Sequence, residues 1–150
     1  MIRIPVSTPS RSYQVLLGSG LLARAGEHLG KLVERRRVFV ITVPPVRRRW
    51  GKVLLQSLAE AGVQAVALEM ADGERFKRLA TLEKLAESLV KLGADRSATL
   101  IALGGGVVCD VMGFLASVYM RGVEVIQIPT TVLAQVDAAI GGKTGVNLHS

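Results

Sequence analysis

The sequence predicts an α/β protein with a Rossmann-like parallel sheet and flanking helices. Apolar, β-branched runs alternate along the chain with segments of helical periodicity, and such alternation is typical of parallel βαβ units. The 16 glycines, together with a 4% content of aromatic residues, indicate many tight turns. The apolar runs are continuous rather than alternating, as expected for strands that are buried on both faces.

The elements are expected in regular order along the chain. Strands are predicted at residues 12–17, 38–42, 63–70, 98–103 and 123–128. Helices are predicted at residues 21–33, 45–61, 78–92 and 107–120. Gly62 and Gly93 are expected to end two of these helices, and Pro45 stands at the start of one, where a missing N–H costs little.

Length and composition favour one cytoplasmic domain. The chain has 150 residues, of which 49% are hydrophobic, so it can bury a core of its own. The sequence has no apolar run long enough to cross a bilayer and no signal-peptide core at its start, so no membrane partner is expected. One cysteine cannot form an internal disulfide, which favours a reducing, cytoplasmic location.

The chain is basic, with a net charge of +7 that is concentrated in two arginine runs at residues 35–37 and 47–49. A nucleic-acid-binding surface is one interpretation of these runs. The first run lies just before a predicted strand and the second lies on a predicted helix, and Trp50 is the only aromatic residue beside them. We therefore predict a solvated basic face and no nucleic-acid partner.

Three consecutive glycines, Gly104, Gly105 and Gly106, end the fourth predicted strand, and a helical segment starts at Val107. Glycine lets a ligand approach the backbone closely, and the first N–H groups of a helix have no partner within the helix. This pattern predicts a turn that binds the pyrophosphate of a nucleotide. The alternative is a tight strand–helix turn without a ligand.

The turn differs from the dinucleotide fingerprint G-x-G-x-x-G at two points. Cys109 stands where the third glycine is usual, and we expect it to be a buried packing residue. The fingerprint also has an acid at the end of the next strand, about 20 residues on. Glu124 has that separation but begins a predicted strand instead of ending one, so the ribose-binding acid is missing.

Polar loops follow three of the predicted strands, at residues 72–77, 104–110 and 130–143. The carboxyl ends of parallel strands meet at one edge of a sheet, where ligands bind, so we expect these loops to meet. A glycine-rich segment at residues 138–147 stands close to the end of the sequence. From this we expect a truncated chain or an excised domain.

Five motifs occur in order along the chain. They are Asp72-Gly73-Glu74-x-x-Lys77, Gly104-Gly105-Gly106-Val107-Val108-x-Asp110, Tyr119-Met120-Arg121-Gly122, Pro129-Thr130-Thr131, and Leu133-Ala134-Gln135-Val136-Asp137 with Gly141-Gly142-Lys143-Thr144-Gly145-Val146-Asn147. With them the chain resembles the amino-terminal, NAD-binding half of the 3-dehydroquinate synthases, which belong to the sugar phosphate cyclase superfamily. The resemblance implies a dehydroquinate synthase-like NAD-binding domain at residues 1–150, without the carboxyl-terminal domain that holds metal and substrate.

The resemblance also implies an activity for the parent protein. Members of the family are lyases that convert DAHP, a phosphorylated seven-carbon keto acid, to 3-dehydroquinate and phosphate in the shikimate pathway. NAD⁺ transiently oxidises one hydroxyl group, which acidifies the neighbouring C–H and permits loss of phosphate. A divalent metal, zinc or cobalt, polarises the oxygen at the reacting carbon. The family implies a homodimer.

Site residues are implied by matching the family's motifs. The cofactor contacts are Asp72, Gly73, Glu74, Lys77, Gly104, Gly105, Gly106, Val107, Asp110, Thr130, Thr131 and Lys143. The residues placed near the nicotinamide and the substrate are Asp137, Lys143 and Arg121, and the resemblance implies that the last acts across a dimer interface. The alternatives are structural: a surface ion pair of Glu74 with Lys77, a helix-dipole role for Asp110 in the first helical turn, and helix caps for the two threonines.

The sequence departs from the family in two respects. Where members often carry an acid that holds the adenosine ribose, this chain has Val43-Pro44-Pro45. The metal ligands of the family lie in its carboxyl-terminal domain, and His28 and His149 of this chain lack ligand spacing. We therefore expect the chain alone to be inactive, to bind NAD⁺ weakly or not at all, and to have a mobile loop at residues 130–147.

Other functions fit the same residues. Within the superfamily, a 2-deoxy-scyllo-inosose synthase or a 2-epi-5-epi-valiolone synthase would share these motifs. Iron-type alcohol and glycerol-1-phosphate dehydrogenases are more distant, and the Gly-Gly-Lys-Thr-Gly-Val-Asn loop argues against them. A non-catalytic binding module with a basic face is the alternative from another class.

Overall fold

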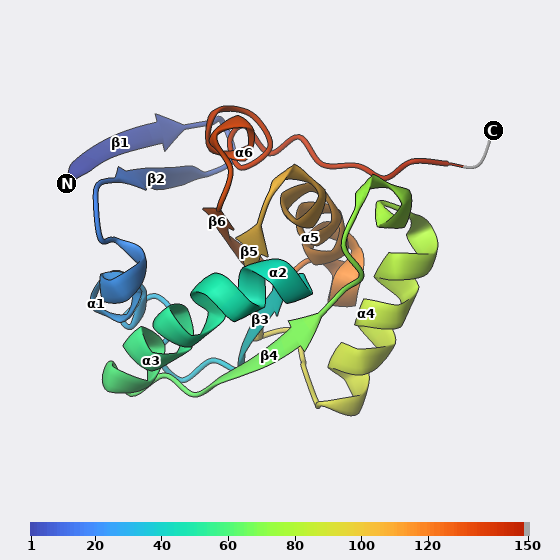
Figure 1. The fold of residues 1–150 in the computed structure, drawn as a ribbon, viewed down its shortest axis with the longest axis horizontal. Coiled ribbons are helices and arrows are strands. Elements are labelled where there is room, and N and C mark those ends of the chain that lie inside the picture. The colour runs from blue at the N-terminus through green and yellow to red at the C-terminus, as the bar shows by residue number, and fades with distance from the viewer. Residues whose placement is uncertain (149–150) are drawn as a thin grey trace.

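A parallel sheet of four strands, in the order β4-β3-β5-β6, forms the centre of the computed structural model, which describes residues 1–148 (Figure 1). Its strands are β3 (Val38–Thr42), β4 (Ala65–Glu69), β5 (Thr99–Gly104) and β6 (Glu124–Pro129). Numbered along the chain, these strands have the order 2-1-3-4, as in flavodoxin-like doubly wound sheets, and the switch point lies between β3 and β5. The expectation of a parallel sheet with flanking helices is confirmed.

The two central strands are buried along their whole length because helices cover both faces of the sheet. Helices α4 (Leu79–Lys91) and α5 (Gly106–Val118) pack on one face, against Phe39 and Ile41 of β3 and Leu100 and Ala102 of β5. Helices α1 (Ala25–Leu29) and α3 (Lys52–Glu60) pack on the other, against the alternate residues of the same strands. This burial on both faces explains the continuous apolar runs.

The chain between β3 and α3 stays helical, with a short helix α2 (Pro44–Val46) followed by a π-helical turn η2 (Arg47–Gly51). The predicted helix at residues 45–61 is therefore confirmed as one helical run with a π-turn inside it. Single 3₁₀ turns stand elsewhere, as η1 (Leu22–Arg24), η3 (Glu74–Phe76) and η4 (Tyr119–Arg121).

The predicted helix at residues 21–33 was too long. The structure has one 3₁₀ turn and a five-residue helix there, ending at Leu29. Gly26 and Gly30 lower the helix propensity of this segment, and a Cβ at Gly26 would collide with the carbonyl of Ser57 on α3. Leu32, which completed the apolar pattern, is exposed.

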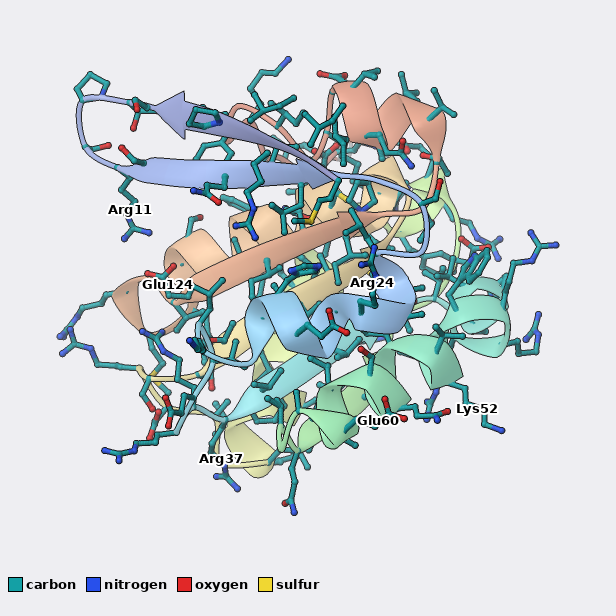
Figure 2. The ribbon with its side chains drawn as sticks, turned by 90° about the vertical axis from the view of Figure 1, so that its left-hand side faces the viewer. Arg11, Arg24, Arg37, Lys52, Glu60 and Glu124 are labelled. Carbon is teal, nitrogen blue, oxygen red and sulfur yellow. The ribbon has the colours of Figure 1, made fainter. Side chains whose placement is uncertain are left out.

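An antiparallel hairpin, β1 (Ile2–Ser7) and β2 (Ser12–Leu17), precedes the sheet and lies beside β6 and the short helix α6 (Val132–Val136) (Figure 1). Sequence patterning predicted only its second strand, because Pro5 interrupts the first and most of its side chains are exposed. Arg11 reaches from the hairpin toward Glu124 at the start of β6, with 3.5 Å between guanidinium and carboxylate (Figure 2).

Both arginine runs are exposed, as predicted. Within residues 1–148, the structure contains no helix with the length and apolar character that a membrane span requires.

Candidate functional site

The glycine turn joins the end of β5 to the start of α5. Gly105 is the N-cap residue in extended conformation, with φ −79° and ψ −169°, and no side chain in the described part of the chain caps this helix. The first intrahelical bond is donated by Cys109 to the carbonyl of Gly105, at 3.0 Å. The N–H groups of Gly106, Val107 and Val108 therefore point out of a 13-residue helix without an intrahelical acceptor, and such an end binds anions.

Two of the three glycines stand where a side chain would be crowded, whereas a Cβ at Gly106 would meet only Ala138 at an ordinary 3.8 Å. None of them has a positive φ. A Cβ at Gly104 would stand 2.5 Å from Val108, and one at Gly105 would stand 3.3 Å from the methyl group of Thr131. The turn is thus closely faced by the segment that follows β6.

The loop after β4 is tied to α5 by an ion pair. Gly73 provides a left-handed turn with φ 117°, and η3 carries Glu74 to Phe76. Lys77 Nζ then stands 2.6 Å from Asp110 Oδ2, and both side chains are only 20% exposed. The alternative given for these residues, a surface ion pair of Glu74 with Lys77, is absent from the ion pairs of residues 1–148.

The expectation that Asp110 lies in the first helical turn is wrong. Because α5 already begins at Gly106, Asp110 stands in the second turn, and the first turn contains no acidic residue. Its carboxylate is held by the Lys77 ammonium, so an interaction with the helix dipole does not account for its position.

The segment after β6 begins at the glycine turn. The N–H of Thr130 donates to the carbonyl of Gly104 at 2.9 Å, which extends the pairing of β5 with β6. Thr131 is the N-cap of α6, and its Oγ1 accepts from the N–H of Ala134 at 3.2 Å. The helix-cap alternative is thereby confirmed for Thr131.

Asp137 and Lys143 lie beyond α6 and are exposed. Lys143 Nζ donates to Asp137 Oδ1 at 3.0 Å, with side-chain exposures of 77% and 58%. The hairpin contacts the segment between these two residues, because the N–H of Gly141 donates to the hydroxyl oxygen of Tyr13 at 3.2 Å. These surface contacts fix the pair in place.

The chain then runs back over α5 to the loop after β4. The side chain of Thr144 lies against Gly113, where a Cβ would collide with its methyl group. Asn147 donates from Nδ2 to Glu74 Oε1 at 2.9 Å and from its backbone N–H to the carbonyl of Lys77 at 2.7 Å. All three predicted loops therefore meet at the carboxyl edge of the sheet.

Sequence reasoning missed part of this contact set. Thr144 and Asn147 belong to one of the five motifs but were given no role, and Gly113 and Tyr13 were not considered. Gly113 carried a signal, since a glycine in the middle of an apolar helix costs about 1 kcal/mol of helix propensity and usually has a packing reason.

Two predicted site residues stand apart from this cluster. Arg121 lies in η4 at the start of β6, which is the opposite edge of the sheet, and it is exposed with φ 65°. The structure does not bring it to the other site residues of the same chain. Asp72 is exposed, and no described contact joins it to the rest.

Cys109 is fully buried, as predicted, and its Sγ lies 3.8 Å from the carbonyl of Gly104. Burial, with a smaller contribution from the Asp110 carboxylate, raises the pKa of this thiol from 9.0 to about 12. It packs helix against strand at the position of the fingerprint's third glycine.

Metal-binding side chains do not gather within the described range. Residues 1–148 contain no group of three or more histidine, cysteine, aspartate or glutamate side chains that could hold an ion. His28 lies in α1, away from the site, and His149 lies outside the described residues.

Comparison with known proteins gives matches over the whole chain. The family model described as "3-dehydroquinate synthase N-terminal" matches residues 67–150. The 3-dehydroquinate synthase of Koribacter versatilis is 53% identical over 151 residues, which cover 100% of this chain and 41% of that protein. The chain thus spans about two fifths of the length of the curated relatives that it matches.

Solved structures of related enzymes share the fold. A 2-deoxy-scyllo-inosose synthase complexed with carbaglucose-6-phosphate, NAD⁺ and Co²⁺ superposes with a TM-score of 0.88 at 26% identity, over 98% of this chain and 40% of that one. A 2-epi-5-epi-valiolone synthase from Streptomyces hygroscopicus, with NAD⁺ and Zn²⁺ bound, gives a TM-score of 0.81 at 33% identity, over 95% of this chain and 39% of that one.

Proposed function

The chain belongs to the 3-dehydroquinate synthase N-terminal family, and from this membership we propose that residues 1–150 are the NAD-binding domain of a longer, cytoplasmic enzyme. That enzyme converts DAHP to 3-dehydroquinate and phosphate in the shikimate pathway. Its relatives carry this name at up to 53% identity. The coverage of about two fifths supports a second domain outside this sequence.

The observation that carries the proposal is the uncapped start of α5. Three N–H groups without intrahelical acceptors stand beside glycines that leave the backbone open, at the edge of the sheet where ligands bind. Gly104, Gly105, Gly106 and Val107 hold the pyrophosphate there. NAD⁺ supplies a hydride acceptor when bound. Thr130 and Thr131 border the cofactor on the β6 side.

The loop after β4 provides groups for the ribose. Glu74 holds Asn147 through Oε1. A carboxylate accepts up to about four hydrogen bonds, so Glu74 can also accept from ribose hydroxyls. Lys77 donates to Asp110 and, as an ammonium, has further hydrogens for a ribose or phosphate oxygen. Asp72 and Gly73 of the same loop are the remaining proposed contacts to the cofactor.

Asp137 and Lys143 face the reacting end of the cofactor. The Lys143 ammonium is largely exposed, so it is free to attract the anionic substrate, which carries a phosphate and a carboxylate. Asp137 orients it through the 3.0 Å hydrogen bond. Both groups act on the substrate side of the site.

Arg121 acts in a second subunit. It stands at the far end of a six-residue strand, on the order of 20 Å from the carboxyl edge, so it cannot serve the site of its own chain. We propose a homodimer in which Arg121 of one protomer faces the substrate phosphate in the other.

The metal belongs to the part of the enzyme outside this sequence. The described residues do not fit a divalent ion, so its ligands are proposed to lie in the second domain. The chain alone is then inactive. It binds NAD⁺ weakly because the contacts that the second domain would make with the cofactor are missing.

A second function within the superfamily is favoured by the structural comparison. The cyclases that make 2-deoxy-scyllo-inosose and 2-epi-5-epi-valiolone superpose closely, although their identity of 26% and 33% is below that of the dehydroquinate synthases. Turnover of DAHP, rather than of other sugar phosphates, by the product of the complete reading frame separates the two functions.

The experiment compares two glycine variants in NAD⁺ titrations of the product of the complete reading frame, in which both walls of the cofactor site are present. Gly105→Val and Gly18→Val place a Cβ with the same 3.3 Å nearest neighbour, but only the first crowds the pyrophosphate turn. We expect Gly105→Val to weaken NAD⁺ binding by at least about tenfold, or ~1.4 kcal/mol, and Gly18→Val to leave it unchanged. Equal affinity in a folded Gly105→Val protein would contradict this placement of the cofactor. A native protein that binds no NAD⁺ would leave a non-catalytic binding module as the better account.

A further inference from the structure

The carboxylate that is proposed to bind the ribose is held by a residue far away in the sequence. Glu74 stands in η3 and is exposed, and its Oε1 accepts from Asn147 Nδ2 at 2.9 Å. This is the one hydrogen bond of its carboxylate within residues 1–148, where it also takes part in no ion pair. An exposed glutamate loses side-chain freedom when it binds a ligand, so a group that already holds it lowers the cost of binding.

Two cations of the same loop are directed elsewhere. Lys77 pairs with Asp110 at 2.6 Å, and the guanidinium of Arg75 lies over the phenyl ring of the next residue, 4.7 Å from its centroid. Among the contacts that the structure describes, the amide of Asn147 sets the direction of the Glu74 carboxylate. An amide suits this place, because it donates to the carboxylate without neutralising it and leaves the other lone pairs available to ribose hydroxyls.

The backbone around Asn147 is itself anchored. Its N–H donates to the carbonyl of Lys77 at 2.7 Å, which ties it to the loop that carries the carboxylate. Val146, the residue before it, is partly buried and packs against the core between α4, α5 and the sheet. Thr144 lies against α5. Because the asparagine side chain is short, an anchored backbone leaves its amide little freedom.

We propose that Asn147 is a positioning residue of the cofactor site, which holds the Glu74 carboxylate in the direction that the ribose of NAD⁺ requires. It acts through Glu74 and makes no contact with the cofactor of its own. The inference rests on the proposed function, because it requires NAD⁺ with its pyrophosphate on the start of α5 and a ribose beside the loop after β4.

The test is a set of NAD⁺ titrations of the product of the complete reading frame and of the variants Asn147→Asp, Glu74→Gln and Glu74→Gln/Asn147→Asp. Asn147→Asp keeps the size of the side chain but sets an oxygen against the Glu74 carboxylate, which repels it. We expect the dissociation constant to rise about fivefold, and about fivefold also in Glu74→Gln, because a neutral acceptor binds hydroxyls more weakly.

The double variant separates positioning from a structural role. In the Glu74→Gln background, the amide introduced at position 74 can donate to the aspartate, so the hydrogen bond is restored with donor and acceptor exchanged. There, Asn147→Asp should raise the dissociation constant by less than about twofold. Repulsion of the anionic cofactor, or a displaced segment, would instead weaken binding equally in both backgrounds.

A matched control lies in α3. Gln56 Nε2 donates to Glu60 Oε1 at 3.0 Å, again between exposed side chains. Gln56→Glu therefore makes the same change of chemistry and charge at the other face of the sheet. It should leave the dissociation constant of NAD⁺ unchanged, and a loss equal to that of Asn147→Asp would overturn the inference.

The remaining outcomes distinguish the inference from the proposed function. Unchanged affinity in Asn147→Asp, with weaker binding in Glu74→Gln, would overturn the inference and leave the proposed function standing. An equal loss from Asn147→Asp in both backgrounds would also overturn the inference alone. Unchanged affinity in Glu74→Gln would overturn the ribose contact of Glu74 together with the inference. A native protein that binds no NAD⁺ would overturn the proposed function and the inference with it.

Discussion

The two halves of the candidate site are held in place by different forces. The glycine turn continues β5, which is buried along its length, and leads into α5, whose inner face is buried in the core. The segment at residues 130–147 has one fully covered apolar residue in α6, Ala134, while Val132, Leu133 and Val136 are each at least 70% exposed. Hydrogen bonds and one exposed ion pair fix that segment.

This difference indicates which half is preorganised. The groups proposed to hold the pyrophosphate are positioned by the packing of the sheet and need no ligand to keep them there. Asp137 and Lys143 take their positions from surface contacts, which are individually weak. We therefore expect the half that is proposed to face the substrate to have low local stability, and to be ordered by a partner surface.

The sharpest contrast between the halves is in cysteine reactivity. The pKa of about 12 for Cys109, against 9.0 for an ordinary thiol, corresponds to about a thousandfold less thiolate at neutral pH. We expect native Cys109 to resist iodoacetamide, and a cysteine placed in the exposed half, in Cys109→Ala/Val136→Cys, to react at the rate of a free thiol. Rapid alkylation of native Cys109 would contradict the buried turn.

The same thiol makes stability dependent on pH in a defined direction. Because the folded pKa is the higher one, the unfolded chain releases a proton above pH 9.0 that the folded chain keeps. The contribution of Cys109 to stability is complete below pH 9.0 and is lost as the pH rises toward 12. Denaturant titrations of native protein and Cys109→Ala should diverge above pH 9.0, with the native protein losing more stability.

The next largest expected difference between the two halves is in the free energy of unfolding that a leucine truncation removes. Leu103 of β5 is fully buried, whereas Leu133 of α6 is 71% exposed. We expect Leu103→Ala to lower the free energy of unfolding by about 2–5 kcal/mol and Leu133→Ala to change it by less than about 0.5 kcal/mol. Urea denaturation measures both. Equal losses would mean that the two halves belong to one core.

Gly113 of α5 tests how the two halves are joined, because the side chain of Thr144 packs against it. Gly113→Ala brings a Cβ against the methyl group of Thr144, so the segment over α5 should be displaced while α5 itself gains helix propensity. We expect amide exchange at residues 144–147 to accelerate about fivefold, equivalent to ~1 kcal/mol of local opening. Adding Thr144→Ser removes the methyl group and should restore protection. Failure of this rescue would show that Thr144 does not explain the glycine.

The smallest expected effect is the loss of a cap. Thr131→Ala removes the acceptor of the Ala134 N–H at the start of α6. Because α6 has five residues and lies mostly at the surface, we expect the local stability of α6 to fall by about 0.5 kcal/mol, at the low end for helix caps. The exchange rate of the Ala134 amide should rise with no change in global stability. A change in global stability would place α6 in the core.

Sequence patterning predicted those parts that packing alone determines. Residues 38–42 form a strand with the predicted bounds, because burial on both faces leaves a continuous apolar run. The meeting of the three loops follows from parallel strands. The contacts between the loops do not, because Asn147 and Glu74 are 73 residues apart and their hydrogen bond depends on how each loop folds. The hairpin strand β1 was missed because its exposed residues carry no burial pattern.

Titration of residues 1–150 with NAD⁺ at millimolar concentration, followed by the amide shifts of each residue, tests the central claim most directly, because NMR detects weak binding. If the pyrophosphate lies on the start of α5, the N–H groups of Gly106, Val107 and Val108 should show the largest shifts. Residues of the hairpin and of α1 should stay unchanged. Shifts confined to the basic face or to α6, with none at these three amides, would contradict the claim.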